Sequence, residues 1–206
     1  MDRDDSATAA ERDRLIAAAW SILERTDFAG LKVKRVATQA GVSMRAFYRH
    51  FADKDGLLLV LICEEMQRSA PRLARVVERV VGPEARVRAW IAALIGAAAD
   101  PARVHRAHLF TELTPVLGRR HRGALEEAER ALWRPLLDAI EAGYREGTFR
   151  GGDPAVDARL VYDLAGARLG SALTVDDPAS VDEIIEATMS FVMRALSGGP
   201  PRPPVH

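Results

Sequence analysis

Apolar residues recur every three or four positions along nearly the whole chain, and no long stretch alternates apolar with polar residues. This spacing is typical of amphipathic helices and not of strands. We therefore expect an all-α protein of about nine helices. They are expected at about residues 9–25, at two short segments on either side of 40–42, and at about 53–81, 84–99, 101–117, 121–146, 154–175 and 180–196.

Glycine and proline divide this pattern. Gly118 and Gly147 each follow a periodic segment and are expected to end a helix, as glycine often does. Pro71 and Pro135 lie inside periodic segments and are expected to kink or divide them. The tail at 198–206, GGPPRPPVH, is too poor in packing side chains to join a core and is expected to be disordered.

The two short segments carry the most informative motif. They meet at Ala40-Gly41-Val42, a connection too tight for anything except a helix-turn-helix. Gly41 supplies the positive φ that ends the first segment, and the Ser43 hydroxyl can cap the second. Phe47 and Phe51 are expected to point inward.

The opposite side of the second segment carries Met44, Arg45, Tyr48 and Arg49. A short helix with one apolar side and such an outer side suits the DNA major groove. Arg45 is the first candidate for base reading, because a guanidinium fork matches guanine O6 and N7. Met44 can contact a thymine methyl group, and Arg49 and His50 are expected to join either the base or the phosphate contacts.

Charge supports this interpretation locally, although not globally. The whole chain has 29 basic and 29 acidic residues, so net charge alone argues against nucleic acid. Between residues 28 and 54, however, only one residue is acidic, Asp53, and six are basic: Lys32, Lys34, Arg35, Arg45, Arg49 and Lys54. A local cluster of this kind is what phosphate neutralisation requires.

These residues resemble the DNA-binding domain of the tetracycline-repressor (TetR) family of bacterial regulators. The matching segments are Leu15-Ile16-Ala17-Ala18-Ala19, Val36-Ala37, Ala40-Gly41-Val42-Ser43, and Phe47-Tyr48-Arg49-His50-Phe51 with Lys54 and Leu57-Leu58. A weaker similarity to the family's C-terminal helices covers 141–154 and 164–173. One departure is Leu31-Lys32, which stands where family members usually have threonine or serine at the start of the first helix of the helix-turn-helix.

The resemblance implies roles for particular residues. Tyr48 and Lys54 match phosphate-contacting positions, and Lys34 matches a position that reaches the groove edge in some members. Lys32 opposes the helix dipole and gains from a nearby phosphate. With Ser43 as the cap, the expected DNA-binding set is Lys32, Lys34, Ser43, Met44, Arg45, Tyr48, Arg49, His50 and Lys54.

The resemblance also implies a small-molecule effector that binds between the middle helices, shifts the fourth helix and releases a repressor from a palindromic operator. The expected pocket residues are Trp90, Leu94, His108, Phe110, Glu112, Trp133, Leu137 and Tyr144. Each apolar member can equally be plain core. The effector itself cannot be named from the sequence.

The last two helices carry apolar arcs too wide for one supporting layer to cover. We infer that they also pack against a second copy in a four-helix dimer interface. The residues expected there are Leu160, Leu164, Leu169, Ile184, Ile185, Met189 and Val192. Two-fold symmetry would then place the helix-turn-helix motifs of the two copies about 34 Å apart, which is one turn of DNA.

Two alternatives stay open. One is a regulator controlled by a protein partner or by nothing, with a filled core in place of the pocket. The other is a metal-dependent helical-bundle enzyme built on His105, His108 and Glu112, which share one side of a helix. No nucleophile–base motif or phosphate-binding glycine loop supports an enzyme, so we expect none, and no metal or cofactor.

Composition sets the remaining expectations. Hydrophobic residues form 48% of the chain and charged residues 28%, as in ordinary globular proteins. The apolar runs are too short for a membrane span, no secretory signal is visible, and a single cysteine, Cys63, fits a reducing cytoplasm. We expect a DNA-binding domain at 1–54 and an effector-binding and dimerisation domain at 55–197.

Overall fold

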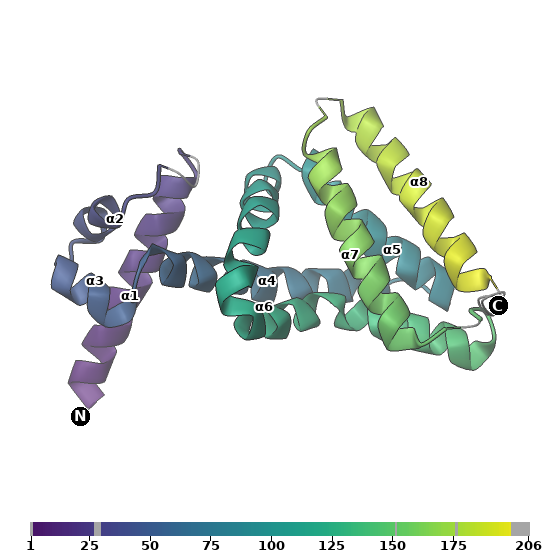
Figure 1. The fold of residues 1–206 in the computed structure, drawn as a ribbon, viewed down its shortest axis with the longest axis horizontal. Coiled ribbons are helices and arrows are strands. Elements are labelled where there is room, and N and C mark those ends of the chain that lie inside the picture. The colour runs from purple at the N-terminus through teal and green to yellow at the C-terminus, as the bar shows by residue number, and fades with distance from the viewer. Residues whose placement is uncertain (1, 27–29, 151, 176, 199–206) are drawn as a thin grey trace, which may run out of the picture. The chain divides into compact units, whose positions relative to one another are not determined.

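The structure is a computed structural model that describes residues 2–26, 30–150, 152–175 and 177–198. Every regular element in these ranges is a helix, which confirms the all-α prediction (Figure 1). The tail predicted to be disordered lies outside them from residue 199 onward. None of the helices found there combines the length and the apolar character that crossing a membrane requires.

The described ranges contain eight α-helices and one short 3-10 helix, η1. Their bounds are α1 Asp2–Leu23, α2 Val33–Ala40, α3 Met44–His50, α4 Lys54–Glu78, α5 Pro83–Ile95, η1 Gly96–Ala99, α6 Val104–Glu146, α7 Pro154–Ala172 and α8 Pro178–Ser197. Most bounds agree with the sequence pattern to within a few residues. The exceptions are α1, which begins earlier, and the region of α6.

The chain forms two compact units. The first comprises residues 1–64 and 113–122, and the second comprises 65–112 and 123–206. Helices α4 and α6 each contribute residues to both units. The structure therefore groups the chain differently from the boundary expected after residue 54.

In the first unit, α1 packs against α2 and α3 (Figure 1). The side chains of Leu15, Val36, Phe47 and Leu57 are completely buried there. Burying one such side chain stabilises a fold by about 1.5–3 kcal/mol relative to leaving it in water. This core supports α3, whose seven residues are too few to form a stable helix alone.

In the second unit, α5, α7 and α8 pack against one another. Trp90 of α5 is completely buried, and its Nε1–H donates to the carbonyl oxygen of Leu132 at 3.0 Å. Both α7 and α8 begin with proline after an aspartate that caps the first turn. Asp153 accepts from the N–H of Ala155 at 2.8 Å, and Asp177 accepts from that of Ala179 at 3.0 Å.

Helix α6 corrects two predictions about the middle of the chain. Gly118 does not end a helix, and Pro135 does not divide one. The non-helical residue inside α6 is His121, with φ −127° and ψ 32°. The chain passes from the first unit to the second immediately afterwards, between Arg122 and Gly123, so the break coincides with a change of packing partners. Pro71 lies inside α4, which continues through it.

Gly147 ends α6 with φ 75°, as predicted. The chain then turns so that the Phe149 N–H donates to the Gly143 carbonyl oxygen at 3.0 Å, and the Phe149 ring lies over Gly143. A Cβ at position 143 would overlap this buried ring. Glycine is therefore required by close packing at a position where the helix itself would accept alanine.

We expect Gly143→Ala to lower the free energy of unfolding by about 1–3 kcal/mol, since the ring must move out of a packed site. Urea unfolding measures this directly. Gly123→Ala in the same helix is the matched control, because a Cβ there meets nothing within 4 Å. It should raise stability by about 0.5–1 kcal/mol through helix propensity. Similar effects of both substitutions would contradict the packing argument.

Candidate functional site

The turn between α2 and α3 has the geometry that the sequence predicts. Gly41 adopts φ 67° and ψ 34°, the left-handed conformation that a side chain disfavours. The Ser43 Oγ accepts a hydrogen bond from the Ala46 N–H at 3.1 Å and caps α3. These two local features set the direction in which α3 leaves the turn.

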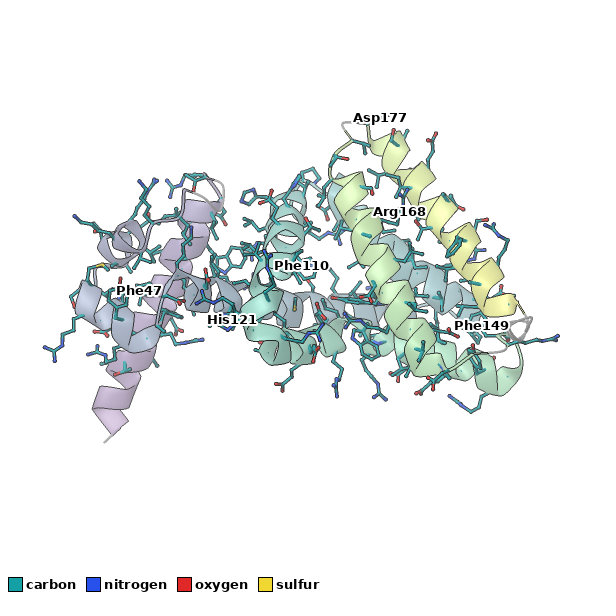
Figure 2. The ribbon with its side chains drawn as sticks, in the orientation of Figure 1. Phe47, Phe110, His121, Phe149, Arg168 and Asp177 are labelled. Atoms are coloured by element: carbon teal, nitrogen blue, oxygen red, sulfur yellow. The ribbon has the colours of Figure 1, made fainter. Side chains whose placement is uncertain are left out.

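Helix α3 has one buried side and one exposed side. Phe47 and Phe51 are buried, as predicted, and Figure 2 labels Phe47 within the first unit. On the other side Arg45 is exposed and the Tyr48 residue is 57% exposed. The Tyr48 ring meets the Phe47 ring edge-on, with centroids 5.5 Å apart, so its hydroxyl is presented from a supported position.

Helix α2 adds a basic surface that the sequence indicated only in part. Residues at its start and along its exposed side line a shallow depression; they are Lys32, Lys34, Arg35, Thr38 and Gln39. Arg35, Thr38 and Gln39 were not expected as site residues. Their spacing of three and four positions places them on one helix face, and this signal could have found them. Lys32 occupies the N-cap position and gives α2 no side-chain cap.

A carboxylate of α1 holds two of the expected DNA-binding residues. Glu11 Oε2 lies 2.5 Å from Arg49 Nη2 and 3.2 Å from His50 Nε2. The His50 side chain is only 5% exposed, so its position favours a role in holding α3 against α1 over a contact with DNA. The hydrogen bond from His50, and then that from Arg49, lower the pKa of Glu11. Sequence reasoning missed Glu11, because the contact spans almost forty residues.

Helix α4 begins as expected. The Asp53 Oδ1 accepts the Gly56 N–H at 2.8 Å, which caps its first turn, and half-buried Lys54 follows. Asp55 pairs with Arg120 of α6 at 2.9 Å within the first unit. The first turn of α4 is thus fixed by both its own cap and an ion pair.

The second unit contains a cavity of about 60 Å³. Side chains from α4, the α5–η1 segment, the start of α6 and α7 line it: Glu65, Met66, Ser69, Arg72, Leu73, Ala93, Leu94, Ala97, Arg103, Arg106, Ala107, Phe110, Leu132 and Leu169. Of the eight residues expected around a pocket, Leu94 and Phe110 line this cavity. Phe110 is labelled in Figure 2.

The other six expected pocket residues do not line this cavity. Trp90 and Leu137 belong to the core, and Glu112 is exposed. The Tyr144 hydroxyl donates to Asp157, and burial raises the pKa of Tyr144 to about 12. The remaining two, His108 and Trp133, are not among the lining residues either. Periodicity cannot separate such core residues from lining residues, because both lie on apolar helix faces.

No group of three or more histidine, cysteine, aspartate or glutamate side chains in the described part of the chain is arranged to hold a metal ion. His105 and Glu112, two members of the trio in the alternative hypothesis, are both exposed on α6.

The apolar arcs of α7 and α8 divide into an inner and an outer part. Leu169, Ile185, Met189 and Val192, expected at a dimer interface, are buried within the subunit. Leu164 and Ile184 are half-buried, and Leu160 is 61% exposed. Val156 and Phe191, which were not expected there, are each 55% exposed. A groove of about 350 Å³ runs between the two helices and is lined by residues including Leu160, Leu164 and Phe191.

Comparison with known proteins agrees with this arrangement. Residues 15–61 match the sequence profile described as "Bacterial regulatory proteins, tetR family". This segment covers most of α1, the helix-turn-helix and the start of α4. These residues form a DNA-binding domain of the TetR family.

Solved structures share the fold over nearly the whole chain. A TetR-family transcriptional regulator from Pectobacterium atrosepticum superposes with a TM-score of 0.73 at 19% identity, covering 95% of this chain and 98% of its own. FadR from Bacillus subtilis, solved with stearoyl-CoA, gives 0.63 at 18% identity, covering 86% and 97%. RolR, solved with resorcinol, gives 0.66 at 16% identity, covering 96% and 98%. Both units therefore have the fold of TetR-family regulators.

The Glu11 contacts make the first unit sensitive to acid. Because the pKa of Glu11 is lowered from 4.5, its carboxylate stabilises the fold above that value and the stabilisation is lost as pH falls below it. We expect Glu11→Gln to lower the melting temperature near pH 6 and to have a much smaller effect well below pH 4.5. Asp13→Asn, at an exposed position of α1, is the control and should show no such convergence. A pH-independent effect of Glu11→Gln would contradict the ionic account.

Proposed function

We propose that the protein is a homodimeric repressor that binds a palindromic operator through α3 and leaves it when a small molecule occupies the cavity of the second unit. The observation that carries the DNA-binding part is the exposed side of α3. It presents Arg45 and Tyr48 beside the basic surface of α2, while Phe47 anchors the helix from behind.

Within this proposal, the residues divide by chemistry. Arg45 reads a guanine edge and Met44 contacts an adjacent apolar group. Tyr48, Lys54, Lys32 and Lys34 contact phosphates, which fix register without reading sequence. Ser43 supports the start of α3, and Arg49 reaches a phosphate only by exchanging its ion pair with Glu11.

The exposed apolar side of α7 and α8 supports the dimer. Val156, Leu160 and Phe191 lie in water in the isolated chain, around a groove lined mostly by apolar side chains. A large exposed apolar patch on a soluble protein marks an interaction surface. A second copy is the occupant that we propose, because a two-fold contact gives the self-complementary pairing that a palindromic site requires.

The path from cavity to DNA would run along α4 and α6. Asp55 pairs with Arg120 in the first unit, and Glu65 pairs with Arg106 at 2.8 Å in the second. Both pairs join the same two helices, and Glu65 and Arg106 also line the cavity. A ligand that competes for Arg106 therefore acts on the helix that begins at Lys54. A coupling free energy of about 1–3 kcal/mol is enough for a useful switch.

The cavity also bears on the alternatives. A regulator without an effector would have a filled core at this place, whereas about 60 Å³ exceeds the space of a single water molecule. The small-molecule complexes of FadR and RolR show that this fold accommodates ligands in other proteins. We favour a regulator over an enzyme, because the exposed side of α3 has a clear use in binding DNA and none in catalysis.

The roles of Arg45 and Lys54 can be separated by operator binding. We expect Arg45→Ala to cost about 1–3 kcal/mol at the operator and to relax preference at one base pair. Lys54→Ala should weaken binding to all sequences alike and reduce the salt dependence by about one phosphate contact. Fluorescence anisotropy on the operator, on single-base variants and on unrelated DNA gives both quantities. Uniform losses for both substitutions would contradict this division of roles.

The dimer interface has a matched test on the surface of the second unit. We expect Leu160→Glu to weaken self-association by at least about tenfold, because a charge would be buried against the second copy. Val81→Glu is the control: Val81 is 92% exposed, lies between α4 and α5, and is not among the residues that line the groove. Sedimentation velocity measures both variants. A Leu160→Glu protein as dimeric as the wild type would exclude this face.

A further inference from the structure

The cavity of the second unit has an apolar part and a charged part. The apolar part includes Met66, Leu73, Leu94, Phe110, Leu132 and Leu169. The charged part consists of Glu65 and three arginines, Arg72, Arg103 and Arg106. A pocket built only to bind neutral apolar molecules would not need three guanidinium groups at its wall. The next question is which of them are already neutralised by carboxylates of the protein.

Two of the three arginines already have carboxylate partners. Arg106 Nη1 lies 2.8 Å from Glu65 Oε2, and that carboxylate also accepts from Arg68 Nη1 at 3.2 Å and from the Ser69 hydroxyl at 3.3 Å. Arg103 Nε donates to Asp100 Oδ2 at 2.5 Å and Nη1 donates to the Ala93 carbonyl oxygen at 3.3 Å.

Arg72 differs from both. Its Nη2 donates to the Ser69 Oγ at 2.7 Å, a neutral hydroxyl that in turn donates to Glu65. No carboxylate in the described part of the chain lies within salt-bridge distance of Arg72. Burial and then the charge of Arg103 lower the pKa of Arg72, and the charges of Glu65 and Asp100, neither of them in direct contact with Arg72, oppose this only in part. A bound anion would stabilise this half-buried cation.

We propose that the cavity binds a small organic monocarboxylate, with its carboxylate on the guanidinium of Arg72 and its short apolar group between Met66, Leu94 and Phe110. This inference rests on the proposed effector-controlled function and names the chemical class of the effector. A guanidinium fork matches a planar carboxylate through two parallel hydrogen bonds.

The size and lining of the cavity narrow the class. About 60 Å³ holds only a few water molecules, so this space accommodates a short ligand group of a few carbon atoms. The apolar lining would contact nothing on an inorganic anion such as phosphate. A short-chain carboxylate uses both parts of the wall.

Binding at Arg72 also explains how the ligand would act. Its carboxylate would stand beside Ser69, the residue that links Arg72 to Glu65. Arg106 would then face two carboxylates in place of one, and the α4–α6 ion pair would be shared with the ligand. Arg72 is therefore a ligand-binding residue, and Ser69 positions it.

Isothermal titration of the full-length protein with butyrate and with its neutral isostere butyramide tests the charge. We expect butyrate to bind at least tenfold more tightly than butyramide and than inorganic phosphate. Butyrate should also lower affinity for operator DNA. Arg72→Gln should abolish the preference for butyrate, and Arg72→Lys should keep part of it. Arg75→Gln, at an exposed position of the same helix, is the control and should leave the preference intact.

Equal binding of butyrate and butyramide would overturn the proposal, as would no detectable butyrate binding, equally tight phosphate binding, or a preference that survives Arg72→Gln. If Arg72→Gln fails to fold, the wild-type comparison and Arg72→Lys still decide. Operator retardation by unliganded protein is measured in parallel. If the protein binds operator but binds butyrate and butyramide equally well, only the proposed ligand class is wrong. If it binds butyrate but no operator, the proposed DNA-binding function is wrong.

Discussion

The second unit depends on the way in which Glu65 is satisfied. This residue is buried, and a buried carboxylate is costly unless charged and polar partners surround it. Arg106, Arg68 and Ser69 meet this requirement, and the Arg106 contact links α4 to the start of α6. Removing Arg106 would leave the Glu65 charge only partly compensated beside the cavity. The same group that holds the two helices together therefore forms part of the wall that a ligand meets.

The helix-turn-helix depends on a different constraint, the short length of α3. Seven residues give too few backbone hydrogen bonds to be stable alone, so the helix exists because its buried side is held. Phe47 and Phe51 supply the apolar contact, Ser43 supplies the cap, and Glu11 supplies an ion pair with Arg49 and a hydrogen bond with His50. An exposed surface placed on a helix supported in this way is positioned more firmly than one placed on a loop.

The sequence predicted the features that neighbouring residues determine. The left-handed Gly41, the Ser43 cap, the Asp53 cap and the end of α6 at Gly147 each need only a few adjacent residues, and all are found in the structure. Features set by distant contacts could not be predicted in the same way. Glu11 meets α3 across the helix-turn-helix, and the break in α6 lies at His121, where packing partners change, and not at the glycine nearby. The pocket was the least predictable, since apolar spacing cannot distinguish the lining residue Leu94 from the buried Trp90.

The pairing of Glu11 with Arg49 bears on how the regulator would respond to ionic strength. Each unpaired cation that docks on a phosphate displaces counterions condensed on DNA, and their number sets the steepness with which salt weakens the complex. In the proposed complex, Arg49 would leave a surface ion pair with Glu11 in order to contact a phosphate. Its exchange of one anion for another releases fewer counterions than a free arginine would. The complex should consequently tolerate changes in cellular salt better than a count of the basic residues on α2 and α3 suggests.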